Sequence, residues 1–218
     1  QIASESIAKC IGYVDNSFAH VKDDSFYYGE QKICSVNTLA IVGKHNYDNA
    51  CAAIDAVWSL TQDVNAITKG LGDFSGLAHR LQFISEVNGV KYYDDSIATT
   101  PSSAIAALRS FEGSKVIILG GSSKGSDFTE LAEELKIQGA KAILIGDEAT
   151  KIAKSCDLAG FKDYEFIDGG NMVTIVNRAM ELSKPGGIVL LSPASASFGL
   201  FKNYADRGDQ FQQAVRML

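Results

Sequence analysis

Three short polar segments hold the residues that could do chemistry, and each follows an apolar run typical of a buried strand. Residues 94–96 are Asp-Asp-Ser, residues 120–127 are Gly-Gly-Ser-Ser-Lys-Gly-Ser-Asp, and residues 192–198 are Ser-Pro-Ala-Ser-Ala-Ser-Phe. Ligands bind beyond the carboxyl ends of the strands in open α/β sheets. This spacing predicts that carboxylates, hydroxyls and one lysine meet at the edge of a sheet.

The glycine-rich segment at 120–127 offers backbone amides and Lys124 to an anion, because it follows a β-branched strand and precedes a helix. The GxxxxGK[ST] spacing of a phosphate loop is absent, so the segment does not by itself indicate triphosphate binding. From the residues alone, Lys124 is either a ligand-binding cation or part of an ordinary surface turn.

The segment at 192–198 offers hydroxyls and an aromatic ring. Ser195 and Ser197 can orient a carboxylate, and the ring of Phe198 can cover a small ligand. A run of small residues selected for tight packing explains the same sequence equally well.

Three further polar residues have simple structural interpretations as well. Asp95 ends a predicted strand, and Thr100 and Pro101 suit the N-cap and the first position of the next helix, so Asp95 could be no more than an acidic neighbour of a cap. Arg80 could stack on a base or bond a phosphate, although a single arginine at a hinge is more often solvated. Asn46, taken alone, suits a helix cap.

Apolar periodicity alternates between strand and helix patterns from residue 81 onward. Strands are predicted at 81–87, 91–94, 115–119, 142–145, 165–167 and 188–191, and helices at 102–110, 128–137, 148–157, 172–182 and 204–217. This alternation predicts an α/β fold with a Rossmann-like, doubly wound, mainly parallel sheet.

The first third of the chain has a different pattern. Residues 25–34 favour a hairpin with Gly29 and Glu30 at its turn, and residues 46–60 favour a helix with one apolar face. Three glycines within residues 70–76 indicate a hinge between domains. We therefore expect a partial α/β domain at 1–72 and a complete α/β domain at 73–218.

Composition excludes several classes of function. The net charge is −6 and the pI is near 5.1, and no Lys/Arg stripe offers the phosphate neutralisation that nucleic-acid binding needs. No apolar run approaches the roughly 20 residues of a membrane span, and the first residues do not resemble a signal peptide. Cys10, Cys34, Cys51 and Cys156 lack metal-site spacing, so we expect reduced, buried thiols in a cytoplasmic protein. The first residue is not Met, which suggests a fragment.

Together these segments resemble the C-terminal domain of the Mur ligase family over nearly the whole chain. The resemblance rests on residues 94–96, on the loop at 120–125, and on Phe-Lys-Asn-Tyr-Ala-Asp-Arg-Gly-Asp-Gln-Phe at 201–211. It is strongest with the members that add D-glutamate to UDP-N-acetylmuramoyl-L-alanine. Residues 43–49 also match the family's G-x-H-N-x-x-N motif, which implies that residues 1–72 are the tail of its central ATP-binding domain.

The resemblance implies two sets of binding residues. Those for D-glutamate would be Thr99, Lys124, Ser197, Phe198 and Tyr204. Those for the nucleotide would be Asn46, Asn49, Arg80 and Asp95. The family usually has Lys where this chain has Ile97, so one cation is missing on the nucleotide side and Ile97 is given no role.

The resemblance also implies a monomeric, cytoplasmic ligase that uses ATP and Mg²⁺ and works through an acyl phosphate. The family's phosphate loop, its UDP-binding domain and its carbamylated lysine are absent from these 218 residues. The chain is therefore expected to be inactive alone, with Mg²⁺ held mainly by the missing part.

Two other functions stay open. A sister ligase could add another amino acid, as the diaminopimelate, lysine or folylpolyglutamate enzymes do, although the Ser-x-Ser-Phe loop and the lack of a DNPR-type motif favour D-glutamate. A doubly wound domain that holds a nucleotide without catalysis would explain the missing phosphate loop.

Overall fold

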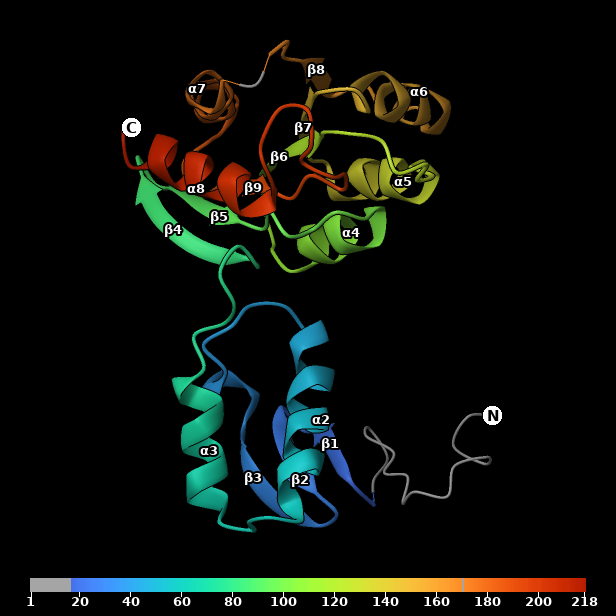
Figure 1. Cartoon of the computed structure of the whole chain (residues 1–218). Helices are drawn as coiled ribbons and strands as arrows, with labels where there is room; N and C mark the ends of the chain where they lie inside the picture. The colour runs from blue at the N-terminus through green and yellow to red at the C-terminus, as the bar shows by residue number, and fades with distance from the viewer. Residues whose placement is uncertain (1–16, 170) are drawn as a thin grey trace. The chain divides into compact units, whose positions relative to one another are not determined.

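The computed structural model describes residues 17–169 and 171–218 and divides into two compact units. Unit 1 ends at Gly76, and unit 2 runs from Leu77 to Leu218, so the chain passes from one to the other once. Each unit has its own sheet and helices (Figure 1). The boundary that the sequence suggests, after residue 72, lies slightly earlier than this division.

From residue 17 onward, unit 1 is a three-stranded antiparallel sheet with two helices packed against it. Its strands, in spatial order, are β1 (Ala19–Lys22), β2 (Ser25–Tyr28) and β3 (Gln31–Ser35). They are followed by the 3-10 helix η1 (Val36–Thr38) and the helices α2 (His45–Trp58) and α3 (Val64–Asp73). Apolar side chains from the strands and from both helices form its core.

The predicted hairpin of unit 1 is confirmed, with Gly29 in the left-handed conformation at its turn (φ +54°). Strand β1 was not predicted, because its four residues are too few to show a period. Ala19 and His20 are buried, whereas Val21 and Lys22 are exposed.

The predicted hinge at 70–76 is wrong for its first residues, which are helical. Gly70 and Gly72 lie in the last turns of α3. The Asp63 side chain caps this helix by accepting hydrogen bonds from the amides of Asn65 and Ala66, and Ile67 is buried in the core of unit 1. Capping and burial therefore outweigh the low helix propensity of the two glycines.

Unit 2 is the predicted doubly wound domain. Its strand order is β4-β5-β9-β6-β7-β8, and all neighbours are parallel except β4 and β5. The strands are β4 (Gln82–Val87), β5 (Val90–Asp94), β6 (Lys115–Gly120), β7 (Lys141–Ile145), β8 (Tyr164–Phe166) and β9 (Ile188–Leu191). The helices are α4 (Pro101–Arg109), α5 (Thr129–Gln138), α6 (Ala149–Ala159), α7 (Met172–Leu182) and α8 (Tyr204–Val215).

Helices cover both faces of this sheet (Figure 1). One core joins α4, α5 and α6 to the sheet, and a second core joins α7 and α8 to it. In β6, Ile117 and Leu119 belong to the first core, whereas Val116 and Ile118 belong to the second. Side chains alternate between the faces of a strand, so a strand buried on both faces is apolar throughout.

The strand order brings three strand ends together. β9 lies between β5 and β6, and its last residue, Leu191, pairs with Asp94 of β5 and with Ile118 of β6. β6, β7 and β8 follow one another outward, and β9 then returns to the centre of the sheet. The three following segments therefore leave the sheet side by side at the switch point, where such sheets usually bind ligands.

Three of the four cysteines can be placed, and all three are buried free thiols, as predicted. They are Cys34, Cys51 and Cys156, and Cys10 lies outside the described residues. Burial raises the pKa of Cys51 and of Cys156 to about 11, so both thiols stay protonated near neutral pH.

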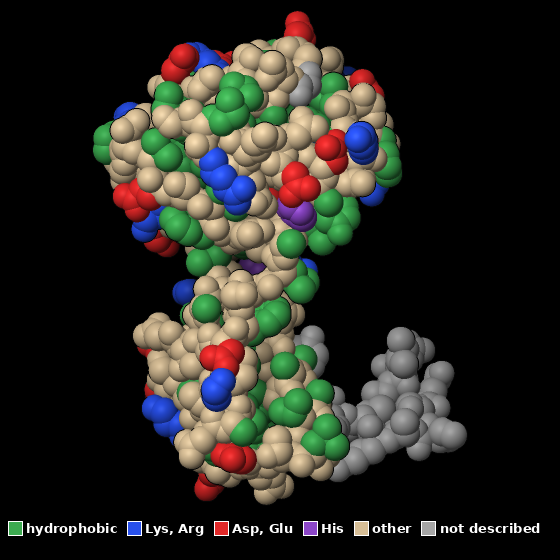
Figure 2. Space-filling view, turned by 60° about the vertical axis from the view of Figure 1, so that its left-hand side comes forward, with side chains coloured by type: hydrophobic (Ala, Val, Ile, Leu, Met, Phe, Trp, Pro, Cys, Tyr) green, Lys and Arg blue, Asp and Glu red, His purple; other side chains and the backbone are tan. Residues whose placement is uncertain are grey.

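The described surface also bears on the excluded functions. No helix in the described part of the chain is long and apolar enough to cross a membrane. On the face shown in Figure 2, Lys and Arg side chains are scattered among acidic ones rather than gathered in a stripe.

Candidate functional site

The carboxylate of Asp95 is buried where β5 leaves the sheet. It accepts hydrogen bonds from the Ser192 hydroxyl (Oγ to Oδ2, 2.6 Å) and from the Leu81 amide (N to Oδ1, 3.2 Å). Asp95 is only 5% exposed, and desolvation raises its pKa to about 6 despite these bonds and the nearby charge of Arg80. Because Ser192 follows β9, this contact ties the β5 exit to the β9 exit.

A buried arginine on α8 holds the same two exits together. The Arg207 guanidinium donates to the Ser96 hydroxyl (Nε to Oγ, 2.9 Å), to the Ser96 carbonyl (Nη2 to O, 2.8 Å) and to the Ser195 carbonyl (Nη1 to O, 3.2 Å). Arg207 is fully buried, and none of the ion pairs found among the described residues includes it. Desolvation lowers its pKa to about 10, which leaves it charged at neutral pH.

Sequence reasoning gave Arg207 no role, although its position on α8 was a usable signal. Phe211 and Val215, four and eight residues later, are buried apolar residues. Residues four apart lie on the same helix face, so Arg207 continues an apolar stripe. A charged residue in such a stripe indicates a buried donor that the fold itself must satisfy.

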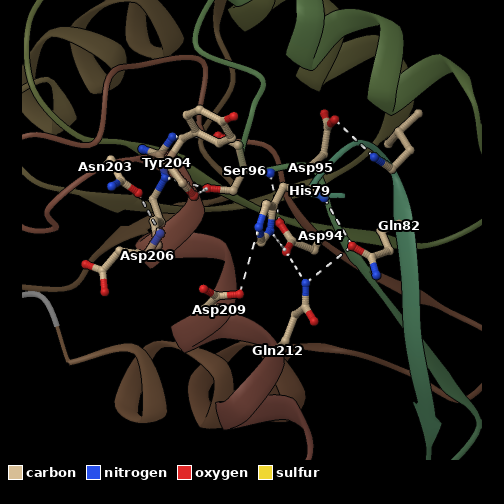
Figure 3. Close-up of polar contacts among 12 residues, drawn as sticks. His79, Gln82, Asp94, Asp95, Ser96, Asn203, Tyr204, Asp206, Asp209 and Gln212 are labelled. Atoms are coloured by element: carbon tan, nitrogen blue, oxygen red, sulfur yellow. Dashed lines mark hydrogen bonds and ion pairs between the residues drawn. The ribbon is translucent and has the colours of Figure 1, made fainter. Parts of the chain in front are cut away.

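Ser96 also fixes the start of α8 (Figure 3). Its hydroxyl donates to the Tyr204 carbonyl (Oγ to O, 2.7 Å), and Asn203 caps the helix by accepting a hydrogen bond from the Asp206 amide (N to Oδ1, 2.9 Å). The predicted Tyr204 therefore lies at a helix end anchored to the β5 exit, with its side chain accessible at 42% relative exposure.

The other acid at the β5 exit, Asp94, is buried beside His79 (Figure 3). Nδ1 of His79 lies 2.7 Å from Oδ2 of Asp94, and Nε2 of Gln212 donates to the same oxygen at 2.8 Å. Oδ1 of Asp94 accepts the Ser96 amide at 2.9 Å. The second ring nitrogen of His79 lies 3.8 Å from Oδ1 of Asp209. Sequence reasoning gave neither this histidine nor this acid a role of its own.

The inner half of the loop after β6 is fixed by close backbone contacts. A Cβ atom at Gly120 would collide with the carbonyl oxygen of Ile145, and one at Gly121 would collide with that of Ala196. Both glycines also have positive φ angles, +112° and +141°. Ser122 forms a β-bridge with Ala196 through a 2.9 Å hydrogen bond from its amide. The loop is therefore paired with the β9 exit.

The outer half of the same loop is exposed. The amides of residues 120, 122 and 125 donate to acceptors within unit 2, so these three amides are not free to bind an anion. Lys124 is exposed and makes no hydrogen bond or ion pair with the described residues. Its ammonium remains available to an anionic ligand. The bridge between Ser122 and Ala196 places Lys124 and Ser197 on neighbouring segments.

The remaining predicted residues of unit 2 differ in exposure. Ser197 is buried, and Thr99 is half-buried next to Thr100, which is the N-cap of α4 as predicted. Phe198 is 60% exposed, so its ring lies at the surface. Arg80 is also exposed, one residue from Leu81, whose amide bonds the carboxylate described above.

The two predicted asparagines lie in unit 1, near the start of α2. Asn46 is not the cap, because α2 begins at His45 and the N-cap position is Lys44. Nδ2 of Asn46 donates to the Val42 carbonyl at 2.6 Å, and Nδ2 of Asn49 donates to Oδ1 of Asn46 at 3.0 Å. Both asparagines line an apolar groove of about 460 Å³ between α2 and α3.

The chemistry of the unit 2 edge suits binding and orientation. The residues predicted there include an accessible lysine, an accessible arginine and two accessible aromatic side chains, together with a buried hydroxyl and a buried carboxyl group. Within residues 17–169 and 171–218, no group of three or more His, Cys, Asp or Glu side chains could hold a metal ion.

Comparison with known proteins bears on the whole chain. Residues 79–195 match the family model described as Mur ligase, glutamate ligase domain. A protein of Pelotomaculum thermopropionicum named UDP-N-acetylmuramoylalanine--D-glutamate ligase is 39% identical over 186 residues, which cover 85% of this chain and 40% of that protein. One of the same name from Hahella chejuensis is 40% identical over 195 residues, which cover 88% and 43%. The chain spans less than half the length of these curated relatives.

Solved structures share the fold at lower identity. MurF from Acinetobacter baumannii gives a TM-score of 0.66 at 17% identity, with 91% of this chain and 44% of that chain covered. The UDP-N-acetylmuramate-alanine ligase MurC from Thermotoga maritima gives 0.63 at 17% identity, with 88% and 42% covered.

Proposed function

Because the chain belongs to the Mur ligase family, we propose that it is the part of a longer ligase that binds D-glutamate and part of the ATP. The whole enzyme would add D-glutamate to UDP-N-acetylmuramoyl-L-alanine in the cytoplasmic synthesis of peptidoglycan precursors, and it would act as a monomer. The pairing of the Lys124 loop with the β9 exit supports this proposal most, since it sets a cation beside a hydroxyl-bearing loop at one sheet edge.

The amino acid would bind along this edge. The Lys124 ammonium would bond one carboxylate of D-glutamate, and the hydroxyls of Ser197 and Thr99 would fix the other end of the ligand. The rings of Tyr204 and Phe198 would border the site. The amino group would then point toward the activated carboxyl group of the partner substrate, which converts a bimolecular reaction into an oriented one.

The nucleotide would bind near the β5 exit. Arg80 is exposed and could contact the phosphates or stack on the base, while Asp95 would accept a hydrogen bond from a ribose hydroxyl. A carboxylate has about four acceptor positions, and two of those of Asp95 are used by Ser192 and Leu81, so the residue can take a further bond. Asn46 and Asn49 of unit 1 are the candidates for the adenine.

The reaction itself would begin on the partner substrate. A carboxylate oxygen of UDP-N-acetylmuramoyl-L-alanine attacks the γ-phosphorus of ATP, ADP leaves, and an acyl phosphate results. The D-glutamate amine then attacks the acyl carbon, loses a proton and displaces phosphate, which leaves an amide. We assign the Mg²⁺ that phosphoryl transfer needs mainly to the rest of the enzyme, as the resemblance to the family implies.

ADP release by the whole enzyme tests this function. The enzyme is incubated with ATP, Mg²⁺, UDP-N-acetylmuramoyl-L-alanine and each of a panel of amino acids, with the 218-residue chain as the control. We expect release with D-glutamate and none from the shorter chain. Release that requires another amino acid would make the protein a sister ligase, and no release with any of them would favour a nucleotide-binding module.

A further inference from the structure

Unit 2 begins with a strained turn around Arg80. His79 has a φ of +61° and Leu81 a φ of +43°, so residues in the left-handed conformation stand on both sides of this exposed arginine. Residues with large side chains occupy this region rarely, and they persist there only where the surroundings hold them. The contacts that hold this turn therefore define the position of Arg80.

Backbone hydrogen bonds hold both ends of the turn. The Leu81 amide donates to Oδ1 of Asp95 at 3.2 Å, and the Ile97 amide donates to the His79 carbonyl at 3.1 Å. The His79 amide donates to Oε1 of Gln82 at 3.1 Å. Two of these three bonds connect the turn to the segment that follows β5, which contains one of the predicted nucleotide residues.

The His79 ring occupies a space beside α8 that is open because residue 208 is a glycine. A Cβ atom at Gly208 would collide with Nδ1 of His79 and would lie 2.7 Å from Oδ2 of Asp94, the two atoms that are bonded to each other. Gly208 is buried within α8, where glycine costs about 1 kcal/mol of helix stability relative to alanine. The glycine leaves room for the His79 ring, and this accounts for its presence in the helix despite the cost. On another side, the ring meets the edge of Tyr204, with centroids 6.1 Å apart and an interplanar angle of 81°.

We propose that His79 is a positioning residue, which Asp94 and the Gly208 gap hold so that the turn presents Arg80 and Asp95 to the nucleotide. The nucleotide part of this inference rests on the proposed function. The part that concerns the conformation of the turn does not rest on the proposed function, because it depends only on contacts within unit 2. His79 also contacts Tyr204, so it links the two predicted subsites physically.

Two glycine-to-alanine substitutions in helices give a matched test in the whole enzyme. Gly208→Ala would push the His79 ring from its place, whereas a Cβ at Gly70 of α3 would meet nothing within 4 Å. We expect Gly208→Ala to raise the KM for ATP roughly tenfold or more while kcat changes less than about threefold, because the turn binds but does not react. Gly70→Ala should change neither. An unchanged KM for ATP in Gly208→Ala would overturn the inference.

A double-mutant cycle keeps the test decisive if Gly208→Ala folds poorly. In a His79→Ala background the collision with the ring disappears and only Oδ2 of Asp94, 2.7 Å from the added Cβ, must shift, so the double variant should fold better than Gly208→Ala alone. If the ring transmits the effect, Gly208→Ala adds almost nothing to the rise in KM that His79→Ala causes. Equal, additive effects of the two substitutions would show that α8 acts on the nucleotide without the histidine.

Amide hydrogen exchange in the 218-residue chain needs no activity and separates the two proposals. The Leu81 and Ile97 amides bond the carboxylate of Asp95 and the carbonyl of His79, so their exchange should accelerate about tenfold or more in His79→Ala. Unchanged exchange would refute the positioning role even in an active ligase. Accelerated exchange in a protein whose whole enzyme shows no ATP-dependent activity would refute the proposed function and leave the role of the histidine in the turn standing.

Discussion

The two loops that would enclose the amino acid differ in how firmly they are built. From residue 192 to residue 197, the loop after β9 is buried, and it is bonded to the β5 exit and to α8. At residues 123–125, the loop after β6 is exposed, and Lys124 has no partner among the described residues. The two loops therefore combine a fixed frame with the accessible charge of Lys124.

This difference shows which changes would affect folding and which would affect the ligand alone. In the fixed frame, buried polar groups depend on one another, so removing one leaves others unsatisfied. In the exposed half, a side chain can be removed at almost no cost to the fold. Free energies of unfolding for variants of the two parts should therefore separate clearly.

The largest effect is expected where the two loops touch. Gly121→Ala would drive a Cβ into the Ala196 carbonyl oxygen, so we expect unit 2 to lose about 4 kcal/mol or more of unfolding free energy. Gly125→Ala in the outer half has a positive φ but open space, and should cost only about 1–2 kcal/mol. Urea unfolding of both variants, followed by circular dichroism, measures the contrast. Equal costs would mean that the loop is not fixed by this contact.

Removing the buried arginine should come next. Arg207→Met would leave three acceptor positions on Ser96 and Ser195 without a donor, and we expect a loss of about 2–4 kcal/mol in unfolding free energy. The matched control is Arg178→Met, because Arg178 also makes charged hydrogen bonds but is partly exposed, and it should cost less than about 1 kcal/mol. Urea unfolding of the two variants measures both losses of unfolding free energy. Similar losses in Arg207→Met and Arg178→Met would contradict a special role for the buried guanidinium.

The pH dependence of the unfolding free energy should reveal the raised pKa of the buried Asp95 carboxyl group. Asp95 has a pKa of about 6 when folded, above its unfolded value near 4, so the folded chain holds its proton to higher pH. Its contribution to stability is therefore fully present below about pH 4 and is lost as the pH rises through about 6. Relative to Asp95→Asn, the wild-type chain should lose roughly 2–3 kcal/mol between pH 4 and pH 7. Parallel stability curves for the two proteins would show that the carboxyl is not perturbed.

The smallest effect on the fold is expected at the exposed lysine. Lys124→Ala should change the unfolding free energy by less than about 0.5 kcal/mol, yet raise the KM for D-glutamate in the whole enzyme roughly 10- to 100-fold through loss of a charged hydrogen bond. Lys154→Ala, an exposed lysine on α6, is the control and should change neither quantity. An unaltered KM in the Lys124 variant would remove this residue from the amino-acid site.

The sequence predicted the sheet of unit 2 well because strands buried on both faces, such as β6 and β9, are almost continuously apolar in sequence. It missed β1, which is too short for a period, and it took the end of α3 for a hinge because the cap at Asp63 was not weighed against two glycines. It also placed the cap of α2 at Asn46, two residues after the actual N-cap position, Lys44.

The site was predicted less completely, for a related reason. Lys124 and Ser197 could be singled out because polar residues follow strands in the sequence. The bonds of Arg207 to residues 96 and 195, and the contact of His79 with Gly208, join positions that are far apart in the chain. A single sequence contains no local pattern for such pairs, so they appear only once the strand order is known.

Unit 2 is one uninterrupted stretch of chain that is entered once, after Gly76. All five residues predicted for D-glutamate lie in it, and the hydrogen bonds that frame them are made within it as well. A single recombination event near the codon for Gly76 would therefore transfer all five of these residues between related genes. Under the proposed function, amino-acid choice would thus be inherited, exchanged or engineered as a single block.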